Sequence, residues 1–167
     1  ATIRANIQAL NYKEPTPIQE AAIPIVLAGR DLMATAQTGT GKTAAFSLPI
    51  LQLLNDRRTF ANDKGRRSKQ RIRALILTPT RELAQQIHGE VVKFTQFEPI
   101  ENMKTPELAS CCVHGGERNR WEQTEKLQSR VDVVVATPGR FIDFLNSETT
   151  NLKRVSMCIV DEADEML

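Results

Sequence analysis

The sequence predicts an α/β fold with a mainly parallel sheet. Short apolar segments alternate with longer amphipathic segments along most of the chain, which is the order that strand–helix–strand units produce. One of the apolar segments, at residues 72–78, is nearly continuous in apolar residues, as a strand buried on both faces should be. A glycine-rich segment at 36–43 lies between an expected strand and an expected helix. These observations favour strands and helices that alternate around one sheet.

Apolar periodicity indicates where the individual elements lie. Strands are expected where short apolar runs occur, at 31–36, 72–78, 108–113, 131–136 and 155–160. Helices are expected between them, at 42–55, 81–97, 117–127 and 138–145. The helix at 81–97 has the clearest period, with apolar side chains at Leu83, Ile87, Val91 and Phe94. Residues 57–70 and 98–106 lack an apolar period, so we expect surface loops there.

Length and composition fit one soluble globular domain. The chain has 167 residues, of which 41% are hydrophobic and 25% are charged, so it can bury a substantial core. No apolar stretch is long enough to span a bilayer, and we expect no membrane partner. The formal net charge of +2 excludes no class of partner.

Neither the cysteines nor the histidines form a recognisable metal or nucleophile pattern. Cys111, Cys112 and Cys158 lie in apolar, strand-like runs without C-x-x-C spacing. We expect buried free thiols, with a zinc site as the alternative. His88 and His114 are interpreted as structural residues. Free thiols are typical of a reducing compartment, so an intracellular protein is expected, in the nucleus or the cytoplasm.

The segment A-Q-T-G-T-G-K-T at 36–43 has the composition of a phosphate-binding loop. Gly39 and Gly41 allow backbone N–H groups to approach phosphate oxygens with no Cβ in the way. The helix that begins near Lys42 points the positive end of its dipole at the phosphates, and Lys42 can reach the β- and γ-phosphates. The Thr43 hydroxyl can ligate Mg²⁺. Ala36 stands where the usual pattern has glycine, so the prediction also depends on the strand and helix around the loop.

Two acidic residues follow the last expected strand, at the edge where α/β sheets place their ligands. Asp161 would hold Mg²⁺, and Glu162 would position or deprotonate an attacking water. The alternative is that both acids only cap a helix. The phosphate-binding loop upstream favours the catalytic interpretation.

Residues 161–164 spell D-E-A-D, and together with the loop at 36–43 they make the chain resemble the first RecA-like domain of DEAD-box RNA helicases. Four further segments agree, in the family's order. They are P-T-P-I-Q at 15–19 (the Q motif), P-T-R-E-L-A at 79–84 (motif Ia), G-G at 115–116 (the GG element) and T-P-G-R at 137–140 (motif Ib). The resemblance implies a RecA-like P-loop NTPase domain over residues 1–167, with helices on both faces of a mainly parallel sheet.

The resemblance also implies an ATP site. Gln19 would read the adenine edge with its amide, and Tyr12 would stack on the adenine ring. Without the family, Gln19 would be interpreted as a helix-start residue and Tyr12 as a core aromatic. Catalysis would depend on Glu162, Lys42 and Asp161, and Mg²⁺ would be held by Thr43 and Asp161. The residues expected to bind ATP are Tyr12, Gln19, Ala36, Gln37, Thr38, Gly39, Thr40, Gly41, Lys42 and Thr43.

A path for RNA is the third implication of the resemblance. Its expected residues are Pro79, Thr80, Arg81, Gly115, Gly116, Thr137, Pro138, Gly139 and Arg140. Hydroxyls, backbone N–H groups and cations suit phosphates rather than base edges, so binding should be independent of base sequence and sensitive to salt. Ordinary strand-to-helix capping is the alternative for 79–84 and 137–140.

The sequence departs from the family pattern at several points. It ends three residues after Asp164, before the family's motif III and second RecA-like domain, and Asn11 stands where many members have glycine. We therefore expect this chain alone to bind nucleotide weakly and hydrolyse it slowly. The full-length protein is expected to be an RNA-dependent ATPase that unwinds short duplexes. Two alternatives stay open: an ATP-dependent RNA clamp, and a P-loop ATPase that acts on DNA or protein.

A basic run at 64–73 holds six basic residues and no acid. It is interpreted as a solvated surface loop, with an auxiliary RNA contact or a targeting signal as the alternatives.

Overall fold

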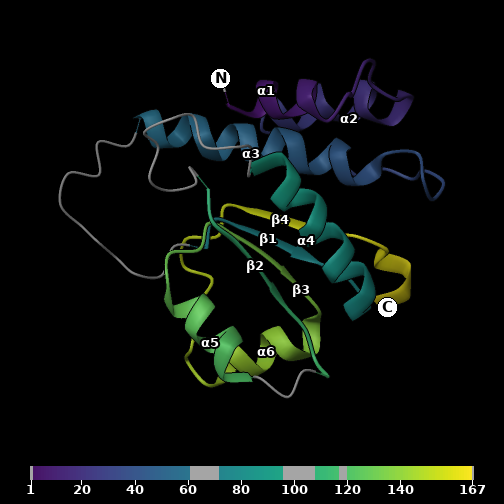
Figure 1. Cartoon of the computed structure of the whole chain (residues 1–167). Coiled ribbons are helices and arrows are strands. Elements are labelled where there is room, and N and C mark those ends of the chain that lie inside the picture. Colours follow the sequence, from purple (N-terminus) through teal and green to yellow (C-terminus); the bar gives the residue numbers. More distant parts are fainter. Residues whose placement is uncertain (1, 61–71, 96–107, 117–119, 167) are drawn as a thin grey trace. The chain divides into compact units, whose positions relative to one another are not determined.

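Four parallel strands form a sheet in the order β2-β3-β1-β4 (Figure 1). The strands are β1 (Ala74–Leu77), β2 (Ser110–Val113), β3 (Val133–Ala136) and β4 (Met157–Val160). The structure is a computed structural model, and it describes residues 2–60, 72–95, 108–116 and 120–166. All three strand pairs are parallel, which confirms the α/β fold class and the parallel sheet that the sequence predicts.

The chain divides into two compact units. The first comprises Ala1–Asn62 and Glu90–Glu107, and the second comprises Asp63–Gly89 and Leu108–Leu167. Helix α4 (Arg81–Thr95) contributes its first part to the second unit and its last part to the first. The prediction of one domain over the whole chain stays a prediction.

Helices cover both faces of the sheet within the second unit. On one face, α5 (Arg120–Gln128) and α6 (Pro138–Asn146) pack on alternate strand residues such as Leu75, Val113 and Val134, and the buried Phe144 lies in the same core. On the other face, the first part of α4 lies against β2, where the His88 Nε2 is 3.2 Å from the Ser110 Oγ. Ala84 and Ile87 of this helix are buried. The prediction of helices on both faces is therefore confirmed in this unit.

The amino ends of three strands are joined by one buried carboxylate. Asp132, which is 2% exposed, accepts a hydrogen bond from the Arg73 Nε (3.1 Å) and one from the Ala109 N–H (3.1 Å). The Arg73 Nη2 lies 3.0 Å from the same carboxylate. Arg73 therefore has a structural partner, although it belongs to the basic run at 64–73. Residues 64–71 of that run lie outside the described residues.

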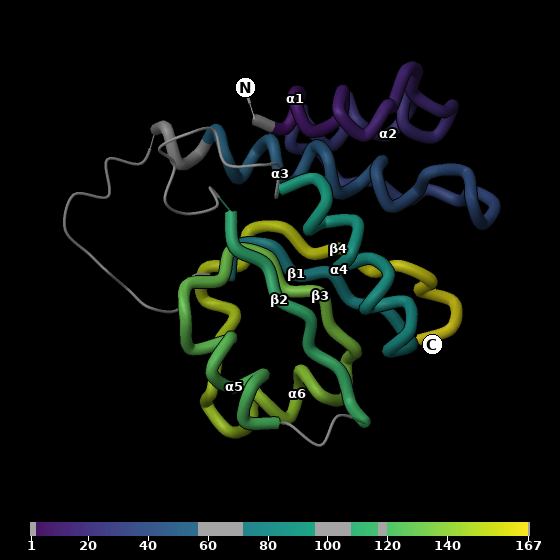
Figure 2. The backbone as a smooth tube through the Cα atoms, viewed as in Figure 1, coloured from purple at the N-terminus to yellow at the C-terminus, as the bar shows by residue number. Residues whose placement is uncertain are grey.

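The first unit contains helices α1 (Thr2–Ala9), α2 (Pro17–Leu27) and α3 (Lys42–Phe60). Helix α3 packs against both α1 and α2 (Figure 2). The apolar pattern of the sequence predicted no helix at the positions of α1 and α2. It ended α3 at residue 55, whereas the helix continues to Phe60, into the segment expected to be a loop. None of the described helices is long and apolar enough to cross a membrane.

One predicted strand is wrong. Residues 31–36 have irregular backbone, and Met33 is 96% exposed. An apolar run forms a strand only where a neighbouring strand pairs with it, and the described part of the first unit contains helices and irregular segments. The other four predicted strands exist and are each two or three residues shorter than expected. The loop predicted at 98–106 lies outside the described residues.

The cysteines are less uniform than the sequence predicts. Cys111 is buried in the second unit, and burial raises the pKa of its thiol to about 12. Cys112 is half-buried, and its side chain points to the face of the sheet opposite to that of Cys111. Cys158 is exposed because it lies on β4, at the edge of the sheet. The described residues contain no group of three or more His, Cys, Asp or Glu side chains that could hold a metal ion.

Replacing Asp132 by alanine should destabilise the chain by about 3 kcal/mol, because a buried charge pair and the hydrogen bond to the Ala109 N–H are lost together. Urea denaturation followed by circular dichroism measures this change. The matched control is Glu122→Gln, which removes the exposed ion pair to Lys126 and should cost below about 0.5 kcal/mol. Equal effects of the two substitutions would show that the buried carboxylate does not stabilise the sheet.

Candidate functional site

The glycine-rich loop at 36–43 ends where α3 begins, at Lys42. Gly39 (φ +81°) and Gly41 (φ +91°) both have left-handed backbone, which side chains with a Cβ rarely adopt. The Thr40 hydroxyl donates to the Gln37 carbonyl oxygen at 2.7 Å, and the Ala45 N–H donates to the Gly41 carbonyl oxygen at 3.1 Å. The loop is therefore a turn that leads directly into the first turn of a helix.

Gln19, from α2, connects this loop to the segment expected to read a nucleobase. Its Oε1 accepts from the Thr16 N–H at 3.1 Å, and its Nε2 donates to the Gly41 carbonyl oxygen at 3.2 Å. Gln19 is buried, and it stands at the third position of its helix, as a capping-box residue does. The helix-start interpretation of Gln19 is thus confirmed, and its contact with the adenine edge stays a prediction. An amide can form four hydrogen bonds, so one N–H and one lone pair stay available for a base edge.

The contact between Gln19 and Gly41 leaves no room for a larger residue at Gly41. A Cβ at this position would lie 2.4 Å from the Gln19 Nε2 and 3.2 Å from the Thr16 Oγ1. Two separate constraints therefore favour glycine at this position: its positive φ and the close approach of the Gln19 side chain.

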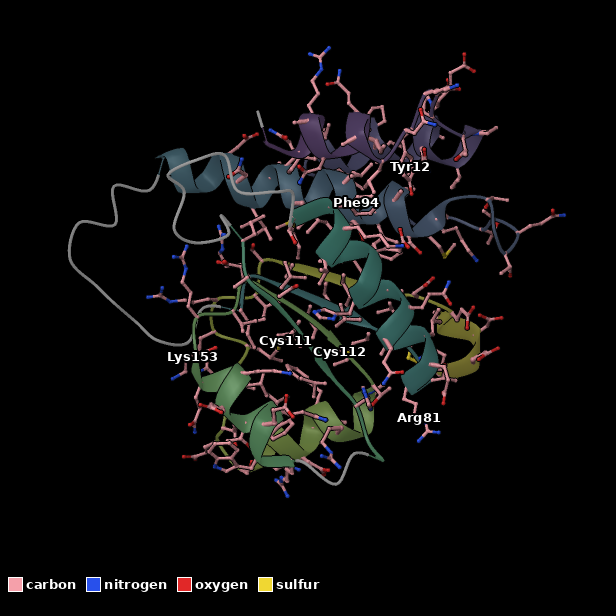
Figure 3. The ribbon with its side chains drawn as sticks, viewed as in Figure 1. Tyr12, Arg81, Phe94, Cys111, Cys112 and Lys153 are labelled. Carbon is pink, nitrogen blue, oxygen red and sulfur yellow. The ribbon has the colours of Figure 1, made fainter. Side chains whose placement is uncertain are left out.

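Tyr12 follows the end of α1 and lies edge-on to Phe94, with ring centroids 6.1 Å apart and an interplanar angle of 72° (Figure 3). Asn11 has φ +60°, and the N–H groups of Asn11 and Tyr12 donate to Gln8 and Ile7 in a Schellman motif. This backbone explains why glycine is suited to the position of Asn11, and asparagine tolerates the same conformation. The buried Asn6 donates from its Nδ2 to the Phe94 carbonyl oxygen at 2.6 Å.

The loop fits a triphosphate on three observations. Its two glycines have left-handed backbone without a Cβ, which allows close approach of an anion, α3 presents its N-terminus there, and Lys42 is half-buried at that terminus. Gln37, Thr38 and Gly39 are exposed, so the loop is accessible to a ligand.

Asp161 and Glu162 follow β4 in the second unit. The Asp161 N–H donates to the Leu77 carbonyl oxygen at 2.9 Å, which extends the pairing of β4 with β1 by one residue. Glu162 has φ +51°, and its N–H is 3.2 Å from the Asp161 Oδ1. This turn ends the strand and starts the short 3₁₀ helix η1 (Ala163–Met166). Both carboxylates are partly exposed at the sheet edge.

A magnesium ion fits the acids better than a tightly bound structural metal does. The described residues hold no group of three or more potential ligands, so no all-protein metal cage is formed by them. Mg²⁺ is usually bound through one or two carboxylates together with phosphate oxygens and water. Within the second unit, the Asp161 carboxylate is an oxygen donor of the required kind.

Residues 79–81 and 115–116 lie together in the second unit. The Thr80 Oγ1 accepts from the Leu83 N–H at 3.3 Å and so caps the start of α4. Arg81 lies across Gly116, which has φ +81°, because a Cβ on this glycine would be 2.9 Å from the Arg81 Nη1. Figure 3 shows Arg81 at the beginning of α4. Arg81 also forms an ion pair with Glu82, which lowers the pKa of that carboxyl below its usual value.

Residues 137–140 form the start of α6. Thr137 has extended backbone, its N–H donates to the Val113 carbonyl oxygen at 2.9 Å, and its own carbonyl oxygen accepts from the Phe141 N–H at 3.2 Å. Gly139 is exposed. The Arg140 side chain is only 17% exposed, its Nε lies 3.9 Å from the Asp143 Oδ2, and its buried Nη1 has no hydrogen-bond partner among the described residues. Gly139 is thus exposed to solvent, whereas Thr137 and Arg140 are half-buried.

The structure brings the predicted residues together in two groups. Within the first unit, Gln19 contacts the loop that contains Gly41 and Lys42. Within the second unit, the four segments that begin at Pro79, Gly115, Thr137 and Asp161 each follow one strand of the same parallel sheet. The individual roles of these residues stay predictions.

Sequence reasoning missed three polar residues of the second group. The His114 ring, which was interpreted as structural, contacts both Gln85 and the carbonyl oxygen of Gly115. Gln123 is buried and donates to the His114 carbonyl oxygen. One signal in the sequence could have pointed to Gln123, because it stands four residues before the apolar Leu127 and so on the same face of a mostly polar helix.

Comparison with known proteins identifies close relatives. A family model described as DEAD/DEAH box helicase matches residues 16–167. The chain is 46% identical over 163 residues to "DEAD-box ATP-dependent RNA helicase 28" of Oryza sativa subsp. japonica, covering 96% of this chain and 18% of that protein. It is 42% identical over 160 residues to "ATP-dependent RNA helicase DDX42" of Homo sapiens, covering 96% of this chain and 16% of that protein.

A solved structure is similar over nearly the whole chain. It is the crystal structure of a DEAD box protein from the hyperthermophile Methanococcus jannaschii, with a TM-score of 0.79 and 36% sequence identity. The match covers 99% of this chain and 40% of that one. The chain therefore spans less than half of this structure and less than a fifth of the two curated relatives.

Replacing Gly41 by alanine should weaken the binding of a nucleoside triphosphate at least about tenfold, because the new Cβ strains the backbone and displaces Gln19. Titration with a fluorescent nucleotide analogue measures the affinity. Gly89→Ala is the matched control: Gly89 lies within α4, no atom of the described part of the chain is within 4 Å of its added Cβ, and affinity should not change. Wild-type affinity in the Gly41→Ala protein would show that Gly41 is not required for nucleotide binding.

Proposed function

Because the chain belongs to the DEAD/DEAH box helicase family, we propose that it is the N-terminal ATP-binding domain of an ATP-dependent RNA helicase. The full-length protein would couple ATP binding and hydrolysis to RNA binding and local duplex unwinding. Two relatives that carry the name ATP-dependent RNA helicase, at 46% and 42% identity, support this proposal.

The hydrogen bond between Gln19 and Gly41 is the observation that carries the proposal furthest. It joins a side-chain amide suited to the adenine edge to the loop suited to the phosphates, within one unit of the chain. Two parts of one nucleotide can therefore be recognised from a single connected set of residues. Tyr12, with its exposed ring edge-on to Phe94, is proposed to stack on the base.

Mg²⁺ is proposed as the companion of ATP, held by the Thr43 hydroxyl and the Asp161 carboxylate. When bound, the ion supplies charge neutralisation at the phosphate oxygens. Glu162 is proposed to orient or deprotonate the attacking water. Its partly exposed position at the end of a parallel strand is where α/β enzymes place such groups.

RNA is proposed to bind along the carboxyl edge of the sheet through its phosphates. Thr80, Arg81 and Gly116 lie at one part of this edge, and Thr137 and Gly139 at the start of α6. Hydroxyls, a guanidinium and glycine N–H groups recognise phosphates without reading bases. Affinity should then fall with rising salt.

A non-unwinding RNA clamp is the second candidate, since it would use the same residues in this part of the protein. A P-loop ATPase that acts on another substrate is less well supported, because the named relatives are RNA helicases. Comparing ATPase stimulation by RNA and by DNA tests the substrate, and a duplex-unwinding assay separates the helicase from the clamp. A second RecA-like domain in the full-length protein is part of this proposal.

An intracellular location is proposed as well. Cys111, Cys112 and Cys158 are all free thiols, which is typical of proteins from reducing compartments.

Replacing Glu162 by glutamine in the full-length protein should lower RNA-stimulated ATP hydrolysis by at least about 10²-fold and leave ATP affinity within about twofold, because the amide keeps the side-chain shape but loses the basic carboxylate. Phosphate release with saturating RNA measures hydrolysis, and nucleotide titration measures binding. The control is Glu165→Gln, an exposed acid in the same short helix, which should retain full turnover. Unchanged turnover with Glu162→Gln would exclude Glu162 as the base.

A further inference from the structure

The turn at Gly115 and Gly116 is fastened to two helices through one histidine. The His114 Nδ1 is 2.9 Å from the Gly115 carbonyl oxygen, and its Nε2 is 3.0 Å from the Gln85 Nε2 on α4. The Gln123 Nε2 on α5 donates to the His114 carbonyl oxygen at 3.1 Å. All these residues belong to the second unit. The turn therefore has side-chain contacts to helices on both faces of the sheet.

The chemistry of the partners indicates how the ring is protonated. A carbonyl oxygen can only accept, so the proton of the imidazole lies on Nδ1 and is donated to Gly115. The Nε2 then accepts from the amide of Gln85. Each ring nitrogen has a partner of the opposite kind, as a buried polar ring requires, and His114 is only 4% exposed.

The position of this turn matters because Arg81 lies across it. The Arg81 Nη1 occupies the space next to Gly116 in which a Cβ would be 2.9 Å away. Gln85 is one helical turn beyond Arg81 on α4. The hydrogen bond between Gln85 and His114 and the contact of Arg81 with Gly116 therefore both join the start of α4 to the segment 114–116. A shift of the turn would change the distance between the guanidinium and the glycine N–H groups.

We propose that His114 is a positioning residue for RNA binding, which sets the Gly115–Gly116 turn against the start of α4 so that Arg81 and the turn can meet one phosphate. This inference rests on the proposed function, because it assigns RNA to this edge of the sheet. His114 is too buried to contact RNA itself, so it acts through Gly115 and Gln85. Its role is separate from the ATP-binding loop, which belongs to the other unit.

The test is His114→Phe in the full-length protein, which keeps an aromatic ring and removes both hydrogen bonds. The KM for RNA in the RNA-stimulated ATPase should rise about tenfold, equivalent to about 1.4 kcal/mol. The KM for ATP and the hydrolysis rate without RNA should stay unchanged. His114→Asn should rescue most of the loss, because its amide N–H can donate to the Gly115 carbonyl oxygen as Nδ1 does.

Two further variants separate positioning from general stability. Gln85→Ala removes the hydrogen bond to His114 from an exposed side chain and should raise the KM for RNA by about threefold. This variant tests the positioning role even if the His114→Phe protein does not fold. The matched control is His88→Phe on the same helix. Its ring contacts the Ser110 Oγ, and burial lowers its pKa, but it does not touch the turn, so the KM for RNA should not change.

The outcomes distinguish this inference from the proposed function. If RNA stimulates the wild-type ATPase and the KM for RNA is unchanged in folded His114→Phe and Gln85→Ala proteins, the positioning role is excluded and the proposed function stands. An equal loss of RNA-dependent and RNA-independent hydrolysis, or failure of His114→Asn to rescue, would show a merely structural histidine. A wild-type protein that RNA does not stimulate contradicts the proposed function itself.

Discussion

Parallel pairing of the four strands is the constraint on which the second unit depends. Leu77 pairs with both Ala136 and Val160, and Val113 also pairs with Ala136, so all four strands end at the same level. The chain therefore leaves every strand at one edge of the sheet. The segments that start at residues 78, 114, 137 and 161 are brought to that edge by backbone hydrogen bonds, before any of their side chains contributes.

This arrangement separates residues that stabilise the sheet from residues that can bind. Strand residues such as Val134 and Ile76 are buried and apolar, and the Asp132 carboxylate joins the amino ends of three strands. The polar residues that follow the strands depend on that support. Substitutions at the amino edge should therefore change stability, and those at the carboxyl edge should mainly change binding.

Local sequence patterns predicted the strands and most helices, because apolar runs and helical periods are set by neighbouring residues. They gave residues 31–36 as a strand, which was wrong because a strand depends on a partner that the pattern does not contain. Helix α2 was missed, since Pro17 and Pro24 obscure its period. The contacts of Gln19 with Gly41 and of Arg81 with Gly116 join distant residues, so no local pattern predicts them. The family resemblance marked those four residues without showing which of them touch.

In both units, a side chain forms a hydrogen bond to a glycine carbonyl oxygen in a glycine-containing turn. Glycine gives a backbone that can approach an anion closely, but its freedom makes that conformation costly to maintain. In the first unit the amide of Gln19 donates to the Gly41 carbonyl oxygen, and in the second the imidazole of His114 donates to the Gly115 carbonyl oxygen. In each case a buried side chain bonds the carbonyl oxygen of the glycine, and this bond does not use the N–H group of the same glycine. Restricting the glycine through its oxygen therefore lowers the entropy that binding must overcome, without blocking the donors that an anion needs.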